Sequence, residues 1–192
     1  MVAVPGRATA EIMVIAIAMF VLQVLLGTIG LGIELFALAT PLSHQPWTIV
    51  TSVYAHGNLD HLIANLIGLL IFGLLVERRS TRYRLHGFVL VTGVLAALAQ
   101  VLVATLFGVN AYVVGISGAV FALMGYSMTS NPVTESVIGW FELNARTQIV
   151  IMIVIAVVIT WVTRAEQAAL FGHFTGFLLG MVAGRIHVLR AF

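Results

Sequence analysis

The chain has 192 residues, of which 61% are hydrophobic and only 8% are charged, and its formal net charge is +2. Soluble domains carry roughly 45–50% apolar residues, so this composition indicates an integral membrane protein and excludes an ordinary soluble domain. The small positive balance gives no reason to expect nucleic-acid binding. The chain contains no cysteine, which excludes disulfides and thiol chemistry.

Six apolar windows, separated by polar residues or by Gly and Pro, follow one another along the chain. They cover about residues 11–31, 61–77, 85–107, 116–129, 147–163 and 169–189. The first window follows Arg7 as a secretory signal would, but its apolar run of about twenty residues is longer than a signal core, so we expect a retained helix. The sequence predicts an all-α, multi-pass membrane protein with a single domain over residues 1–192 and a core over about 11–189.

The fourth window is too short to cross a hydrocarbon layer of about 30 Å at about 1.5 Å per residue. We therefore expect its start, Gly115-Ile116-Ser117-Gly118, to lie at membrane depth. A hydroxyl or a free backbone N–H group in hydrocarbon costs several kcal/mol unless it has a partner. A serine alone at such a helix start is most often a cap or a packing residue, so its role depends on what surrounds it.

The arginines predict the orientation of the chain. All nine basic residues are arginines, and eight fall on one side of a six-span arrangement: Arg7, Arg78, Arg79, Arg82, Arg84, Arg146, Arg185 and Arg190. Only Arg164 falls on the other side. This bias predicts cytoplasmic termini and cytoplasmic loops at 78–84 and 130–147, with the long connection 32–60 on the outer side of a cell membrane.

Polar residues from three windows are expected at one depth, in the outer half of the bilayer. His61 and Asn65 are four residues apart and share a helix face at the outer end of the second window. Ser117 begins the fourth window, and His173 lies near the outer end of the last. Two stripes of small residues would let those last two helices approach closely: Gly172, Gly176, Gly180 and Gly184 on one, and Gly118, Ala122 and Gly125 on the other.

If the stripes face each other, Ser117 and His173 come together as nucleophile and base. A serine hydroxyl attacks efficiently only when a neighbouring base removes its proton, and histidine is the usual base. Glu166 is expected in a wet loop, so we predict a Ser–His dyad without a carboxylate. Asn65, the ring of His61 and the backbone N–H of Ser117 could stabilise an oxyanion. The other histidines are expected to take no part in catalysis: His44, His86 and His187.

These residues also resemble a known family, the rhomboid intramembrane serine proteases. The resemblance rests on the G-x-S-G motif of residues 115–118 followed by Phe121-Ala-Leu-Met-Gly-Tyr126, on the H-x4-H-x3-N motif of His56, His61 and Asn65, and on the H-x2-G motif of His173 and Gly176. It covers residues 11–189, with the motifs in the family's order, and implies a six-helix rhomboid-like bundle with a short central fourth helix.

The resemblance implies a peptidase that cuts transmembrane segments of membrane proteins near the outer face, without a cofactor or metal. Ser117 would be the nucleophile, His173 the base, and His61 and Asn65 would line the oxyanion hole; His56, Phe121, Gly115 and Gly118 would support the site. Glu77 and Arg79 match an acidic-x-basic signature, expected to anchor a helix end. The chain departs from the family where Thr48 follows Trp47 in place of arginine, at Phe121 in place of tyrosine and at Gly172 in place of alanine.

Two other classes of protein were weighed against the peptidase. A membrane metallohydrolase would use His56, Asp60, His61 and His173, but the chain has no H-E-x-x-H motif, and His56 and His61 do not share a helical face. An inactive relative that binds transmembrane helices would typically lack the serine or the histidine, and a small transporter would show inverted repeats or charges deep within its spans. The sequence favours the peptidase.

Overall fold

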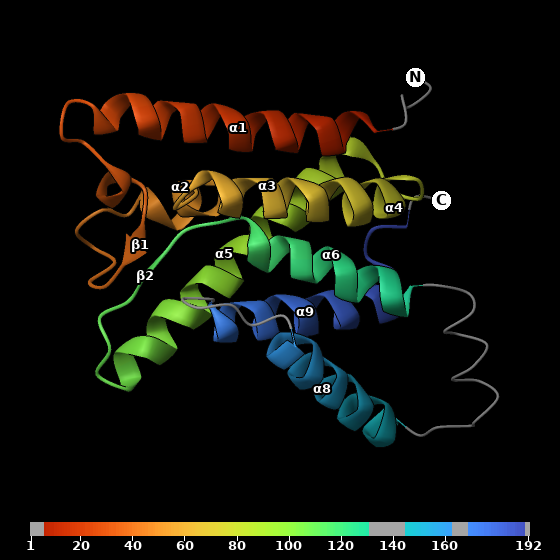
Figure 1. Cartoon of the computed structure of the whole chain (residues 1–192). Coiled ribbons are helices and arrows are strands. Elements are labelled where there is room, and N and C mark those ends of the chain that lie inside the picture. Colours follow the sequence, from red (N-terminus) through yellow and green to blue (C-terminus); the bar gives the residue numbers. More distant parts are fainter. Residues whose placement is uncertain (1–5, 131–144, 163–168, 191–192) are drawn as a thin grey trace.

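The protein is mostly helical in the computed structural model, which describes residues 6–130, 145–162 and 169–190 (Figure 1). Its apolar helices are α1 (Arg7–Gly27), the continuous stretch α3 (Leu59–Gly68), η2 (Leu69–Gly73) and α4 (Leu74–Glu77), then α5 (Arg82–Leu106), α6 (Ser117–Thr129), α8 (Ala145–Val162) and α9 (Leu170–Arg185). Each predicted apolar window is therefore helical. Within the described residues, three helical stretches are long and apolar enough to cross a membrane: α1, residues 59–77 and α5. The fold is that of an all-α multi-pass membrane protein.

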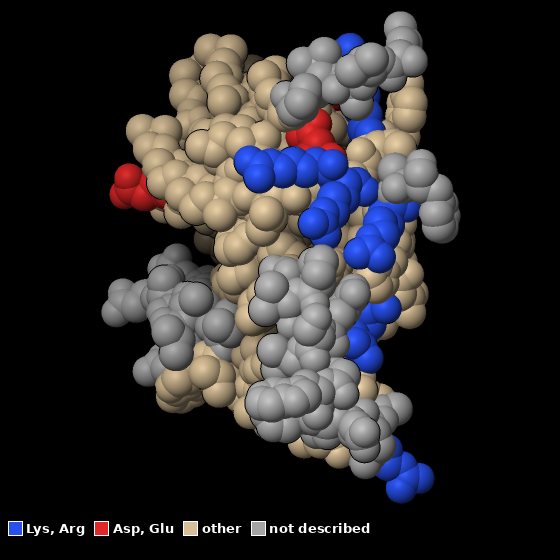
Figure 2. Space-filling view, turned by 90° about the vertical axis from the view of Figure 1, so that its right-hand side faces the viewer, with Lys and Arg blue, Asp and Glu red and all other residues tan. Residues whose placement is uncertain are grey.

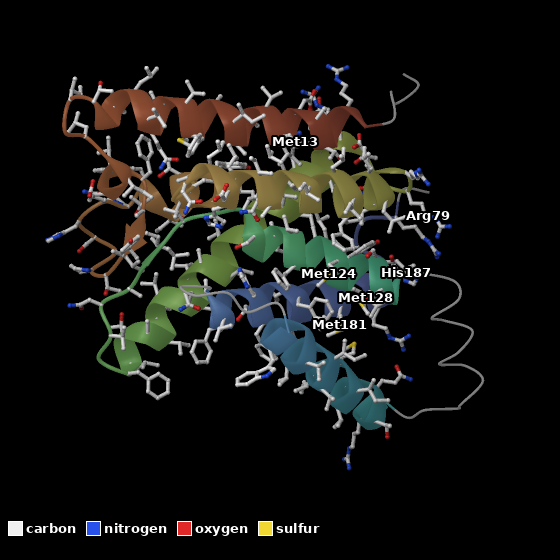
Figure 3. All side chains as sticks on the ribbon, viewed as in Figure 1. Met13, Arg79, Met124, Met128, Met181 and His187 are labelled. Carbon is white, nitrogen blue, oxygen red and sulfur yellow. The ribbon has the colours of Figure 1, made fainter. Side chains whose placement is uncertain are left out.

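The short helix α6 lies at the centre of the bundle. It makes its most extensive contact with α9 and also packs against α5 and the stretch formed by α3, η2 and α4. Helix α8 packs mainly against α9 and diverges from the other helices (Figure 1). Met124 and Met181 lie where α6, α8 and α9 come together (Figure 3). The helix that is too short to span the membrane is therefore enclosed by the longer ones.

The two small-residue stripes do face each other, as the sequence predicts. A Cβ added to Gly176 would lie 2.1 Å from the carbonyl oxygen of Gly118, and one added to Gly180 would lie 2.0 Å from that of Ala122. Both distances are far inside van der Waals contact, so the main chains of α6 and α9 touch directly. The hydroxyl of Thr129 donates to the carbonyl of Met181 at 2.9 Å and joins the two helices at the other end.

The second apolar window contains a π-helix, η2, between α3 and α4. Gly68 directly precedes it and Gly73 is its last residue. A Cβ on Gly68 would lie 2.5 Å from Cγ1 of Val120 on α6, and one on Gly73 would lie 2.9 Å from Cγ2 of Thr9 on α1. The face of His61 and Asn65 continues through Gly68, as predicted, and the missing side chain lets α3 approach α6.

The connection between α1 and α3 carries short structure of its own. It contains the 3₁₀ helix η1 (Ile33–Leu35), the strand β1 (Leu38–Ala39) and α2 (Thr48–Tyr54). Strand β1 pairs antiparallel with β2 (Tyr112–Val113), so Leu38 lies opposite Val113. The indole N–H of Trp47 donates to the carbonyl of Leu35 at 2.9 Å. The pairing of β1 with β2 ties this loop to the segment that leads into α6.

The start of α1 differs from the prediction, since the helix begins at Arg7 and not near residue 11. Glu77, at the end of α4, explains the earlier start. Its carboxylate accepts hydrogen bonds from the backbone N–H groups of Ala8 at 2.8 Å and Thr9 at 3.0 Å, and from the Thr9 hydroxyl at 2.6 Å. A carboxylate at a helix N-terminus satisfies free N–H groups and complements the helix dipole. Glu77 is thus an anchor between two helices.

Glu77→Gln is expected to destabilise the protein by about 2 kcal/mol, because the amide loses the charge and cannot accept hydrogen bonds through both of its polar atoms. The free energy of unfolding, measured by denaturant titration in detergent, checks this. Glu34→Gln removes the same charge from an exposed residue of η1 and is expected to change stability by less than about 0.5 kcal/mol. Equal effects of the two substitutions would contradict the anchoring role.

Candidate active site

Helix α6 begins at Ser117, so the serine stands at a helix N-terminus enclosed in the bundle. The chain enters the helix through Gly115, whose φ of +118° is rarely adopted by other residues. The N–H of Gly115 donates to the carbonyl of Ser52 at 2.8 Å, which fixes this turn against α2. The first N–H groups of a helix have no partner within it, so they remain available near the serine.

His173 on α9 contacts the serine. Its Nε2 atom lies 2.9 Å from Oγ of Ser117, which is hydrogen-bonding distance. The ring of Phe121, one turn beyond Ser117 on α6, stacks on the imidazole with centroids 4.3 Å apart and an angle of 14° between the planes. Nδ1 of His173 is buried and has no hydrogen-bond partner within the described residues. A serine and an imidazole held in this way can exchange a proton.

His61 and Asn65 on α3 lie beside the turn that precedes the serine. A Cβ added to Gly115 would lie 2.8 Å from Nε2 of His61 and 3.7 Å from Nδ2 of Asn65. Asn58 caps α3 by accepting from the N–H of His61 at 2.8 Å, and the amide of Asn65 donates to the carbonyl of His61 at 3.0 Å. Gly115 must therefore be glycine for two reasons, its positive φ and the ring against it. Ser117, His173, His61 and Asn65 thus form one polar cluster in an apolar bundle.

Comparison with known proteins agrees with this arrangement. A family model described as the rhomboid domain matches residues 43–190 of the chain. The protein belongs to the rhomboid family.

Individual relatives are distant, and two of the three described here match about three quarters of this rhomboid chain. RHOMBOID-like protein 5 of Arabidopsis thaliana is 29% identical over 146 residues, which is 76% of this chain and 45% of the relative. Rhomboid-like protease 1 of Toxoplasma gondii is 27% identical over 150 residues, or 74% of this chain and 47% of the relative. The chloroplastic Rhomboid-like protein 11 of Arabidopsis thaliana is 43% identical over 82 residues, 43% of this chain and 28% of the relative. The chain spans less than half the length of these relatives.

His56 of the rhomboid lies next to the cluster and is held by a residue that the sequence analysis missed. Gln23 of α1 accepts from the backbone N–H of His56 at 3.0 Å and donates to its carbonyl at 3.3 Å. The ring of His56 meets that of His61 edge to face at 5.2 Å, and its Nδ1 lies 3.0 Å from the carbonyl of Tyr54. Burial, with a smaller contribution from His61, lowers the pKa of His56 to about 4, so its imidazole is neutral at pH 7.

Gln100 is a second missed residue. Its side-chain oxygen accepts from the N–H of Gly172 at 3.1 Å, and a Cβ on Gly172 would lie 3.1 Å from the carbonyl oxygen of Ala96. Helix α5 therefore fixes the start of α9 immediately before His173. The available signal was an uncharged polar residue within a long apolar helix, since such residues in membranes usually bind a neighbouring helix.

His86, which is expected to take no part in catalysis, lies with its Nε2 3.1 Å from Oε2 of Glu11, whose carboxylate also pairs with Arg7 and Arg82. This cluster lies far from Ser117, at the other end of the bundle. Glu166 and Arg164 lie outside the described residues. Among the residues that are described, no three His, Asp or Glu side chains are grouped so that they could hold a metal ion, as a metallohydrolase would require.

The arginines that the structure describes gather at one end of the bundle, where α1 begins and α9 ends (Figure 2). The same end carries the junction of α4 with α5 and the start of α8 (Figure 1). Ser117 and His173 belong to the opposite half, because α6 and α9 both run toward the arginine-rich end from their first turns. The charged end and the polar cluster are therefore separated along the bundle.

Proposed function

We propose that this rhomboid protein is an intramembrane serine endopeptidase in which Ser117 is the nucleophile and His173 is the base. The observation that carries the proposal is the 2.9 Å separation between Oγ of Ser117 and Nε2 of His173, within a bundle of apolar helices. A partly buried hydroxyl and imidazole have no evident packing advantage over apolar side chains at this depth. Membership of a family of intramembrane proteases supports the same role.

In the first step, Nε2 of His173 accepts the proton of the Ser117 hydroxyl while Oγ attacks the carbonyl carbon of the scissile peptide. This role requires the imidazole to carry its own hydrogen on Nδ1. Phe121 stacks on the ring and Gln100 fixes the preceding residue, so the imidazole is held with little freedom to rotate. Because the base is already fixed, less entropy is lost in orienting the reacting groups on the way to the transition state.

The tetrahedral intermediate places a negative charge on the former carbonyl oxygen. The backbone N–H of Ser117, the ring of His61 and the amide of Asn65 are the donors for this oxyanion, aided by the N-terminal dipole of α6. His173 then gives its proton to the leaving amine, and the peptide bond breaks to leave an acyl-enzyme on Ser117. A water molecule, deprotonated by His173, hydrolyses the ester and regenerates the serine.

The substrates in this proposal are transmembrane segments of other membrane proteins. Such a segment must unwind before attack, because the carbonyls of a helix are already hydrogen-bonded and shielded. With the arginine-rich end on the cytoplasmic side of a cell membrane, both termini are cytoplasmic and the polar cluster opens to the outer side. Residues 1–192 act as one rhomboid-like domain in this view, without a metal or cofactor.

Covalent labelling tests the proposal. Detergent-purified protein is incubated with a serine-directed fluorophosphonate and with a transmembrane reporter peptide, and the labelled site is located by mass spectrometry. We expect the label on Ser117, cleavage of the reporter, and persistence of both in a chelator. Ser117→Ala should show neither, whereas Ser80→Ala, in the short loop after α4, should behave as the wild type.

Reporter cleavage that is unchanged in Ser117→Ala would overturn the proposal. Folded wild-type protein that neither labels nor cleaves any transmembrane reporter would point instead to an inactive relative that only binds helices. Loss of cleavage in a chelator, restored by added zinc, would favour the metallohydrolase.

A further inference from the structure

A cavity of about 170 Å³ opens at the arginine-rich end of the bundle, away from the proposed active site. It lies between α4, the last turn of α6 and the segment that follows α9. Its polar lining consists of Arg78, Arg79, Arg190, Tyr126, Ser127 and Ser130. Arg79 lies at this end of the molecule together with His187 (Figure 3). The lining thus combines three guanidinium groups with three hydroxyl groups, of which the Ser127 hydroxyl already donates to the carbonyl of Met124 at 2.8 Å.

No carboxylate neutralises these guanidinium groups within the described part of the chain. Glu11 pairs with Arg7 and Arg82 across from the cavity, and both oxygens of Glu77 are taken by the start of α1. The carbonyl end of α6 supplies only about half a negative charge. Among the described residues, the three positive charges around this cavity therefore remain largely uncompensated, which favours an anion.

The hydroxyl groups and the surrounding surface indicate which anion fits. Guanidinium and hydroxyl groups are the donors that phosphate oxygens accept from, and arginine binds phosphate with two parallel hydrogen bonds. The cavity is also lined by Leu75, which is 49% exposed, and Ile71 on the preceding turn is 55% exposed. Apolar side chains that face outward beside a basic cavity suit an acyl chain rather than water.

We propose that this cavity binds the phosphate group of an anionic phospholipid, whose acyl chains lie along Ile71 and Leu75. Basic pockets between helices at the membrane surface are a recognised way of holding such headgroups. The site is independent of Ser117 and His173, so it requires no peptidase activity. If the cavity is such a site, the amount of phospholipid that stays bound to the purified protein should depend on the headgroup charge and on the arginines of the cavity.

Native mass spectrometry of the purified protein tests the site by titration with phosphatidylglycerol, phosphatidylcholine and inorganic phosphate. We expect phosphatidylglycerol to be retained preferentially, and Arg79→Gln and Arg190→Gln each to weaken its binding about fivefold. Arg146→Gln, which removes the same charge from an exposed position at the start of α8, should leave binding unchanged.

Equal retention of the two lipids, or equal weakening by all three substitutions, would overturn the proposal. Complete displacement of phosphatidylglycerol by millimolar inorganic phosphate would assign the site to a free anion and would also overturn the lipid assignment. Arg78→Gln provides a further variant, and because all these arginines lie at the surface end of the bundle, thermal unfolding is expected to match the wild type.

Discussion

His173→Ala is expected to lower kcat/KM for a transmembrane reporter by at least about 10³-fold, because the hydroxyl of Ser117 loses the only base within hydrogen-bonding distance among the described residues. Fluorophosphonate labelling of Ser117 should slow in parallel, since labelling also requires deprotonation of the hydroxyl. Reporter cleavage measured at several substrate concentrations should place the loss in kcat, because the imidazole acts on the proton and not on substrate binding.

His86→Ala is the matched control, because it removes a histidine that binds Glu11 at the other end of the bundle. Cleavage by this variant is expected to stay within about twofold of the wild type. Thermal unfolding of His173→Ala should show an intact fold, with at most a small loss from the missing stack on Phe121. A residual rate within about tenfold of the wild type would exclude His173 as the general base.

Gly180→Ala is expected to destabilise the protein by about 2–3 kcal/mol and to abolish most of the cleavage activity. The added Cβ would lie 2.0 Å from the carbonyl oxygen of Ala122 and 2.7 Å from its Cα, where ordinary contacts begin at 3.4 Å. Both neighbours are backbone atoms, so no side-chain rotation relieves the overlap and α9 must move away from α6. Movement of α9 separates His173 from Ser117, so stability and activity should fall together.

Gly87→Ala is the control for this experiment. Gly87 is also a helical glycine, on α5, but nothing lies within 4 Å of a Cβ built there. The substitution should be neutral or should stabilise the protein by up to about 1 kcal/mol, because alanine favours the helix. Unfolding in denaturant with parallel reporter cleavage provides both readouts. Equal stability of the two variants would show that α6 and α9 can adjust to a methyl group.

The sequence predicts best those contacts whose residues recur along the chain at the spacing of a helical turn. The four-residue spacing of Gly176 and Gly180 marks one face of α9. The fourth apolar window is too short to span the membrane, which places Ser117, at its start, at membrane depth. The pairing of Ser117 with His173 follows from those two features. The resemblance implies that Phe121 supports the site, and its ring stacks on the imidazole of His173.

The contacts that escape prediction are single side chains that bind backbone groups of another helix. Gln23 and Gln100 each accept from an N–H group of a segment remote in the sequence, and no repeat in the chain marks such a partner. The family signature predicts Glu77 as an anchor of a helix end, but it does not identify the N–H groups of Ala8 and Thr9 as the partners. Glu77 also accounts for the start of α1 at Arg7, before the predicted apolar window, because its carboxylate supplies acceptors for the first N–H groups of the helix. The π-helix η2 escapes prediction for a related reason, since its wider turn depends on packing between helices.

The backbone contact between α6 and α9 limits how a peptide substrate could reach the serine. The main chains of the two helices touch at Gly118 with Gly176 and at Ala122 with Gly180, so at these points no side chain could rotate to let the helices part. Parting them would expose peptide groups to lipid over several turns, which is costly in hydrocarbon. In the proposed peptidase, the contact between α6 and α9 is therefore expected to stay closed, and a substrate segment is expected to approach α6 from another side.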